Sequence, residues 1–182
     1  MPEIISRESW RRRATLGHAR ALLGQYLVRA GQVPRMITEV EAYDGERDRA
    51  SHARVGRTRR TEVMYGVGGL WYVYLCYGVH EMLNLVVGPE DWPAAVLIRG
   101  LEGCPGPGRV TRALGIDRRF NGMPADRTGG LWLEDHGVRV PRRLVQTGPR
   151  VGVDYAGPIW AAKPWRFSFD PTALPRRPAG SR

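Results

Sequence analysis

Carboxylates, tyrosines and one histidine gather in the stretch 38–102, inside segments whose other residues are typical of buried strands. Side chains alternate along a strand, so the segment 36–43 is predicted to carry its polar groups on one face. That face holds Ile37, Glu39, Glu41 and Tyr43. A carboxylate beside aromatic rings indicates a pocket for a flat, electron-poor ring.

A second aromatic segment, 70–78, places Tyr72 and Tyr74 on one face of a strand and Tyr77 at the turn that follows. Taken singly, a strand glutamate, a half-buried tyrosine or a lone histidine is more often structural than functional. Their concentration in one stretch favours a site. The remaining candidates in that stretch are His52, Asn84 and Arg99.

The elements that must position these residues predict a mixed α/β (α+β) fold, with a curved, mostly antiparallel sheet and peripheral helices. A first helix is expected with Thr15 as its N-cap and Gly24 as its stop, and a second covers 109–114 and ends at Gly115. Strands are expected at 25–30, 36–43, 70–77, 83–87, 94–101, 130–134, 138–140, 150–154 and 166–169.

The domain organisation is predicted to be simple. No repeat or shift in composition marks a second domain, so residues 1–170 are expected to form a single domain. The Pro- and Arg-rich residues 171–182 are predicted to be a disordered tail. The arginine-rich segment 44–63 is long for a loop in a compact domain, which indicates a functional role.

The charge balance points to an acidic partner. The 182 residues carry a formal net charge of +10, which favours nucleic acid, with acidic membrane surfaces as the weaker alternative. Lys163 is the only lysine. Codon bias explains most of that ratio, yet arginine suits bidentate phosphate binding, and almost no amine is left for Schiff-base chemistry.

The location of the protein is predicted from what the sequence lacks. No window approaches the roughly 18 apolar residues of a membrane span, and the first residues do not have the layout of a secretion signal. We therefore expect a cytoplasmic protein, associated with the nucleoid in a bacterium, that is not secreted. Cys76 and Cys104 are expected to be reduced.

The sequence lacks the residue patterns that several other kinds of functional site require. The four histidines stand far apart and no Cys-x-x-Cys or His-Glu-x-x-His spacing occurs, so neither a metal site nor a cofactor is predicted. The glycines of 66–69 precede a strand rather than a helix, which argues against a dinucleotide site. A P-loop and a Gly-x-Ser-x-Gly elbow are absent from the sequence.

Taken in order, these residues resemble the alkyladenine (3-methyladenine) DNA glycosylases, the human-type single-domain enzymes that remove alkylated and deaminated purines. The core motifs are Glu41-Ala42-Tyr43, Ala50-Ser51-His52-Ala53-Arg54, Tyr72-Val73-Tyr74-Leu75-Cys76-Tyr77-Gly78 with Asn84, and Val96-Leu97-Ile98-Arg99. Further landmarks are Gly106-Pro107-Gly108-Arg109, Arg150-Val151-Gly152-Val153 and Lys163-Pro164-Trp165-Arg166-Phe167. The likeness extends from about Leu16 to Phe169.

The resemblance implies a role for each residue. Glu41 would activate a water and stabilise the oxocarbenium-like sugar, while Arg99 would hold the sugar-phosphate near that water. Because water and not an amine attacks, a monofunctional glycosylase without lyase activity is expected. Tyr77 would fill the gap that the flipped nucleotide leaves.

The same resemblance implies a base pocket and contacts to phosphates. Tyr43, Tyr74 and His52 would enclose the flipped base, and Asn84 would restrict the pocket against the amino group of guanine. Tyr72 is a weaker candidate for the wall. Phosphate contacts are expected from arginines, although a solvated basic loop explains any single one nearly as well. These arginines are Arg54, Arg57, Arg59, Arg60 and Arg109.

The chain also departs from the human-type pattern. Glu46 replaces an expected proline, Arg47 and Arg49 stand where the vertebrate form is acidic, and His80-Glu81 replace hydrophobic residues. These departures bear on damage preference more than on the reaction.

The sequence is compatible with three functions. The favoured one is a monomeric enzyme that excises 3-methyladenine, 7-methylguanine, hypoxanthine or ethenoadenine from duplex DNA. A non-catalytic damage-binding protein is the alternative, but it gains nothing from a carboxylate at Glu41. A protein that processes RNA or free nucleosides has no use for a wedge at Tyr77.

Overall fold

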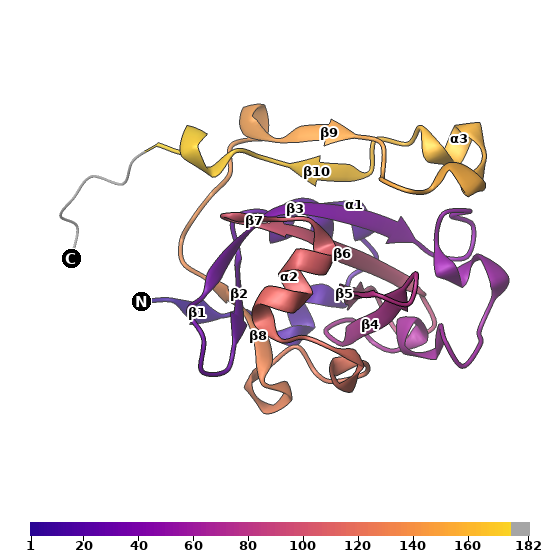
Figure 1. Cartoon of the computed structure of the whole chain (residues 1–182), viewed down its shortest axis with the longest axis horizontal. Helices are drawn as coiled ribbons and strands as arrows, with labels where there is room; N and C mark the ends of the chain where they lie inside the picture. The colour runs from indigo at the N-terminus through magenta and orange to yellow at the C-terminus, as the bar shows by residue number, and fades with distance from the viewer. Residues whose placement is uncertain (176–182) are drawn as a thin grey trace.

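The structure is a computed structural model that describes residues 1–175. Within this span ten strands form an antiparallel sheet with helices at its periphery (Figure 1). Seven strands follow the order β1-β8-β2-β3-β6-β5-β4, while β7 pairs with β6 and β10 pairs with β3 and β9. The predicted mixed fold with a mostly antiparallel sheet is therefore confirmed.

The elements have the following bounds. The α-helices are α1 (Thr15–Leu22), α2 (Pro107–Leu114) and α3 (Pro158–Ala161). The strands are β1 (Glu3–Ile4), β2 (Tyr26–Arg29), β3 (Arg35–Asp44), β4 (Trp71–Cys76), β5 (His80–Val87), β6 (Ala94–Leu101), β7 (Cys104–Pro105), β8 (Leu131–Asp135), β9 (Gln146–Gly148) and β10 (Arg166–Ser168). Single 3-10 turns are η1 (Arg7–Trp10), η2 (His52–Val55), η3 (Glu62–Tyr65), η4 (Arg118–Phe120), η5 (Arg127–Gly129), η6 (Arg142–Leu144), η7 (Asp154–Ala156) and η8 (Pro171–Ala173).

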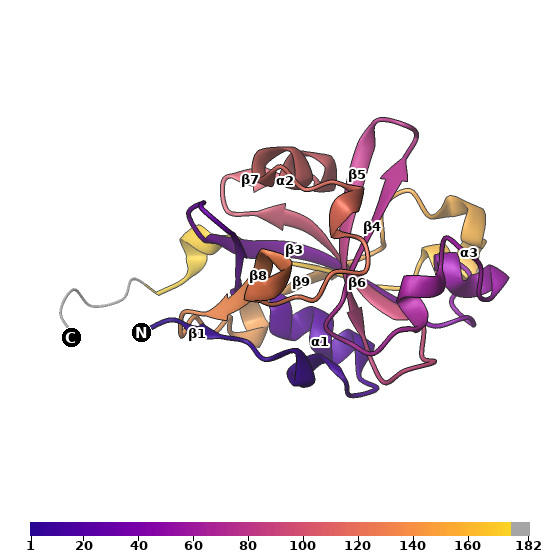
Figure 2. The ribbon, with the colours of Figure 1, turned by 90° about the horizontal axis from the view of Figure 1, so that it is seen from below.

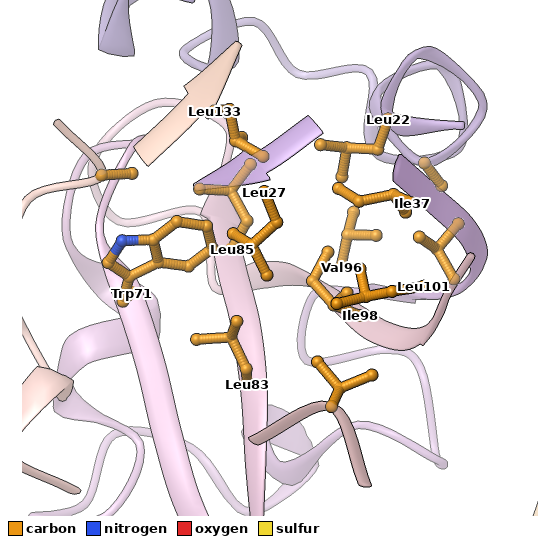
Figure 3. Packing of buried hydrophobic residues seen from close by; sticks show 14 of the residues in the cluster. Leu22, Leu27, Ile37, Trp71, Leu83, Leu85, Val96, Ile98, Leu101 and Leu133 are labelled. Atoms are coloured by element: carbon orange, nitrogen blue, oxygen red, sulfur yellow. The ribbon is translucent and has the colours of Figure 1, made fainter. Parts of the chain in front are cut away.

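The hydrophobic core lies between the sheet and helices α1 and α2. Figure 3 shows Leu22 of α1 packed close to the aliphatic side chains of the sheet, with the Trp71 indole at one side. The Trp71 indole N–H donates to the Leu131 carbonyl at 2.9 Å, so its burial leaves no polar atom unpaired. Each fully buried apolar side chain of this kind stabilises the fold by about 1.5–3 kcal/mol. This packing holds in place the strands that carry the polar residues of the candidate site.

Helix α1 begins one residue earlier than predicted. Ala14 occupies the N-cap, and the Thr15 hydroxyl donates to the Asp44 carboxylate at 2.5 Å instead of capping the helix. The prediction of Thr15 as N-cap is therefore wrong. The stop at Gly24 is confirmed, because this residue follows the last turn with φ +83°, a conformation that favours glycine. Helix α2 begins at Pro107 rather than Arg109.

Two predicted strands are loops. The segment 138–140 packs Val138 and Val140 against the core without joining the sheet, and 150–154 is an irregular segment that leads into η7. Apolar residues in these segments reflect packing of loop side chains. The turn η8 lies within the predicted tail, and residues 176–182 of that tail lie outside the described residues.

Bulges between β3 and β6 decide which side chains face the core. The paired residues are Ile37 with Leu101, Glu39 with Gly100, and Val40 with Ile98, so each strand has one extra residue. Ile37 consequently packs in the core with Val40, and the prediction that Ile37 shares the face of Glu41 is wrong. The extra residue on β6 is Arg99, which the bulge turns toward β3.

No helix among residues 1–175 is both long and apolar enough to cross a membrane.

Candidate active site

Glu41 lies on β3 with no exposed surface, at the wall of a cleft of about 530 Å³. Two donors hold its carboxylate: the Tyr43 hydroxyl at 2.8 Å from Oε2 and the Val151 backbone N–H at 2.8 Å from Oε1. The Arg99 Nε lies 3.4 Å from Oε1. These contacts fix the position of the carboxylate before any ligand enters.

The electrostatics of this carboxylate favour a role as a base. Burial raises the pKa of Glu41 above its usual value, and Arg99, the Val151 N–H and the Tyr43 hydroxyl oppose that rise. A carboxylate with a raised pKa is a stronger proton acceptor near neutral pH. The pKa of the Tyr43 hydroxyl is raised too, by burial first and by Glu41 next, so Tyr43 stays a donor.

Arg99 links two carboxylates at the β6 bulge. Its Nε lies 3.2 Å from Glu39 Oε1, and Arg166 Nη1 donates to the same oxygen at 3.1 Å. The Nη groups of Arg99 form no hydrogen bond within residues 1–175, and the side chain lines the cleft. They are therefore available to an anionic ligand such as a phosphate.

A smaller pocket opens from the cleft and is mainly aromatic. The two hollows have four lining residues in common: Tyr43, His52, Tyr74 and Tyr155. The pocket is completed by Ala50, Ser51, Met64, Tyr72, Asn84 and Ala95. The structure thus brings together all four residues predicted for a base pocket, and it places Tyr72 at the wall.

His52 is held as a neutral ring at the mouth of this pocket. Burial, followed by the charges of Arg60 and Arg54, lowers the pKa of His52 to about 4. Arg60 Nη2 lies 3.4 Å from His52 Nε2, while Nδ1 lies 3.0 Å from the Tyr72 hydroxyl. Arg60 can only donate, so Nε2 of the neutral ring accepts from it. The ring proton is therefore on Nδ1, which donates to the Tyr72 hydroxyl oxygen. The ring meets that of Tyr74 edge-on, with centroids 4.5 Å apart.

Asn84 of β5 has a fixed orientation in the pocket. Its amide nitrogen donates to the carbonyl oxygens of Tyr72 and Met82, each at 3.2 Å. Both amide hydrogens are used, so only the carboxamide oxygen is left for a ligand.

Tyr77 stands at the tip of the β4–β5 hairpin, which projects from the body of the molecule in Figure 2. The Val79 N–H donates to the Cys76 carbonyl at 3.1 Å, and Tyr77 and Gly78 have φ +49° and +72°. This tight turn puts a bulky residue in a conformation that is rare outside glycine. Its side chain is 92% exposed, so packing does not explain why a tyrosine stands there.

A buried ion pair supports the loop that supplies the Val151 N–H. Arg150 donates to Asp48 at 2.5 and 2.9 Å and to the Ala42 carbonyl at 2.9 Å, and neither side chain is exposed. The guanidinium lies between the rings of Tyr43 and Trp165, 4.8 and 5.0 Å from their centroids. Arg150 therefore anchors its neighbour over the site.

The arginines predicted to contact phosphates differ in their surroundings. Arg57 pairs with Asp91 and lies 3.6 Å from Glu62. Arg54 is exposed, and its guanidinium lies 5.0 Å from the Tyr155 ring centroid. Arg109 is exposed in the first turn of α2, close in sequence to the Pro107 that lines the cleft.

Sequence reasoning assigned no role in the site to two contributors from the segment 150–157, although Val151 belongs to one of the landmark motifs. Tyr155 lines both the cleft and the pocket, and the Val151 N–H holds Glu41. No local pattern identifies these roles, because each contact spans more than one hundred residues. Val151 bonds to Glu41 on β3, and Tyr155 bonds to Ala50 in the loop that follows β3.

The chain is similar to known proteins over most of its length. Residues 9–172 match the model of the family described as Methylpurine-DNA glycosylase (MPG). A protein of Anaeromyxobacter dehalogenans, provisionally named a 3-methyladenine DNA glycosylase, is 49% identical over 88% of this chain and 81% of its own length. The DNA-3-methyladenine glycosylase of Arabidopsis thaliana is 43% identical over 83% of this chain and 66% of its own length.

A cleft with a buried carboxylate and an adjoining pocket rich in tyrosines thus occurs in a chain that matches one family model over residues 9–172. The chain belongs to the methylpurine-DNA glycosylase family, and its class of activity is that of a DNA glycosylase, a hydrolase of DNA repair.

Proposed function

We propose that this protein excises damaged purines from duplex DNA by hydrolysis of the N-glycosidic bond, with Glu41 as the general base. The observation that carries the proposal is a fully buried carboxylate of raised pKa in a cleft that adjoins an aromatic pocket. A protein that only binds DNA gains nothing from a desolvated carboxylate facing a polyanion. This argues against the alternative of a damage-binding protein.

The reaction follows from the positions of these groups. The flipped nucleotide puts its base in the pocket and its sugar in the cleft beside Glu41. As the base leaves with the electrons of the glycosidic bond, the carboxylate stabilises the positive charge on the sugar and takes a proton from the attacking water. The products are the free base and an abasic site.

The flipped state is stabilised from two sides. The ring of Tyr77 takes the place of the extruded nucleotide in the stack, which offsets the few kcal/mol that unstacking costs. The Arg99 Nη groups bind the phosphate next to the sugar. The Tyr77 contact requires a stacked duplex and the Arg99 contact requires a phosphate, so single-stranded RNA and free nucleosides are poorer substrates.

The pocket favours alkylated and deaminated purines, including 3-methyladenine, 7-methylguanine, hypoxanthine and ethenoadenine. Aromatic faces of Tyr43 and Tyr74 attract electron-poor rings. A neutral His52 adds no positive charge against a cationic alkylpurine. The fixed amide of Asn84 narrows the floor of the pocket, which disfavours the extra amino group of guanine.

The nucleophile is water, and the enzyme has no lyase activity. Lys163 is the only lysine, and its ammonium lies 4.5 Å from the Trp160 ring centroid, outside the set of residues that line the cleft. An amine is therefore not placed to attack the sugar. The protein acts as a monomer in the compartment that holds the DNA.

Single-turnover assays on end-labelled duplexes with hypoxanthine or ethenoadenine test this proposal. Strand breaks are expected only after alkali treatment, because hydrolysis leaves an intact abasic strand. Breaks before alkali would contradict the assignment of water as nucleophile. Lesion binding without release of any base, on these duplexes or on alkylated genomic DNA, would favour the damage-binding alternative.

A further inference from the structure

A second groove lies beside the catalytic cleft, between the loop 45–55 and the segment of η7 and α3. These segments lie side by side in both Figure 1 and Figure 2. Three arginines face two aromatic residues across it, which is a combination suited to a phosphodiester chain. The lining residues are Glu46, Arg47, Arg49, Arg54, Val55, Tyr155, Ala156, Gly157 and Trp160.

The groove carries a net positive charge, because three arginines and one carboxylate line it. Arg47, Arg49 and Arg54 form no ion pair within residues 1–175. Of the two acidic residues beside them, Asp48 is buried against Arg150, whereas Glu46 accepts from the Tyr65 hydroxyl at 2.6 Å and is the one carboxylate that lines the groove. Like charges gathered without partners destabilise the free protein, and an anionic ligand relieves that repulsion.

The groove is continuous with the proposed active site. An intermediate hollow has Arg54, Val55 and Tyr155 in common with the groove. It has His52, Arg60 and Tyr155 in common with the cleft. A chain that enters the cleft can therefore continue over Tyr155 into the groove without leaving the surface.

Tyr155 lines the groove, the intermediate hollow and the cleft, and its side chain is held in place. Its ring is 58% exposed, while its hydroxyl donates to the Ala50 carbonyl at 2.8 Å and Arg54 covers it from one side. The η7 turn and α3 thus present an aromatic face that is already ordered in the free protein. Such a face packs against a sugar or base at little cost in conformational entropy.

We propose that this groove binds the phosphates of the damaged strand on one side of the flipped nucleotide, with Arg47 and Arg49 as the principal contacts. The inference rests on the proposed function, because it needs a strand that is anchored in the catalytic cleft. The groove would thereby lengthen the stretch of DNA that the protein contacts, in the direction away from the β4–β5 hairpin that carries Tyr77.

The test is the salt dependence of binding to a hypoxanthine duplex. Loss of two phosphate contacts in Arg47→Gln/Arg49→Gln makes the slope of log K against log salt shallower by about 1.8, at about 0.9 for each contact. Between about 50 and about 200 mM salt the wild type then loses about 12-fold more affinity than the variant. Arg47→Lys/Arg49→Lys keeps the charge and is expected to keep the wild-type slope.

A matched control removes the same charge elsewhere. Arg142→Gln/Arg143→Gln changes two exposed arginines of η6, which precedes β9 and does not line the groove. Its slope is expected to equal that of the wild type. An equal drop in this control, or an unchanged slope in Arg47→Gln/Arg49→Gln, would overturn the inference.

Duplex length gives an independent readout. Cutting back the DNA on one side of the lesion, and not on the other, is expected to abolish the difference between the wild type and Arg47→Gln/Arg49→Gln. A difference that survives both truncations would overturn the placement. Base release by the wild-type protein at saturating concentration tests the proposed function separately. Normal release with an unchanged slope would contradict only the groove.

Discussion

The buried pair of Asp48 and Arg150 provides the sharpest prediction about the architecture of the site. Substitution Arg150→Met leaves the Asp48 carboxylate buried without its cation. Removing one partner of a buried ion pair costs about 3–5 kcal/mol, which is a large part of the roughly 5–15 kcal/mol that stabilises a domain. The backbone N–H groups of Asp44 and Ala50 still donate to Asp48, at 3.1 and 3.0 Å, so we expect the lower end of that range.

The assay is urea unfolding of a double-mutant cycle with Arg150→Met, Asp48→Asn and the combined variant. The combined variant removes both charges, so its loss of unfolding free energy is expected to be smaller than the sum of the single losses by about 2 kcal/mol. Losses that add within about 0.5 kcal/mol would refute the coupling. A loss below about 1 kcal/mol for Arg150→Met would refute the cost of the stranded charge.

The same variant links the pair to catalysis. Arg150 anchors the loop whose Val151 N–H bonds to Glu41, and a hydrogen bond to a charged group contributes about 1.5–3 kcal/mol. Under conditions where Arg150→Met is folded, we expect its single-turnover excision rate to fall by about tenfold or more. An unchanged rate would show that Glu41 does not depend on this loop.

Three further predictions concern the wedge and the titrating groups. Tyr77→Ser is expected to weaken lesion binding and flipping without lowering the unfolding temperature, because the side chain is 92% exposed; equal lesion affinity would point to another wedge. Burial raises the pKa of Glu41 from 4.5, so the folded state binds more protons than the unfolded chain, and stability falls as pH rises through the raised value. Glu41→Gln is therefore expected to unfold at higher urea than the wild type at pH 7 and to lose that advantage in acid; a parallel pH profile would contradict the burial argument. His52, with its pKa lowered from 6.5 to about 4, binds fewer protons when folded, so wild-type stability falls as pH drops through that window. His52→Gln is expected to flatten that fall in urea titrations, and an unchanged slope would mean that His52 is exposed.

Local order along the chain was enough to predict most of the candidate site. Glu41 and Tyr43 are two residues apart on one strand, and Tyr74 lies on a strand whose alternation is regular, so their faces follow from the period of two. The strand 94–101 was predicted with its observed bounds, because its apolar run ends at turn residues on both sides.

The failures have long-range causes. The period of two predicts the wrong face for Ile37, because a bulge depends on the pairing between β3 and β6, which the sequence of a single strand does not contain. Thr15 did not cap its helix, because Asp44, which is distant in sequence, accepts its hydroxyl hydrogen. The apolar pattern of 150–154 predicts a strand, but this segment does not pair with the sheet, and the Arg150 side chain holds it in place through bonds to Asp48 and to the Ala42 carbonyl.

The central claim is that Glu41 performs chemistry and does not merely shape the pocket. The most direct test compares wild-type protein with Glu41→Gln, which keeps an oxygen that can accept from the Val151 N–H, on one hypoxanthine duplex under single-turnover conditions. Lesion affinity is expected to stay within a few fold while base release falls below detection. Base release at the wild-type rate with Gln at position 41 would contradict the account.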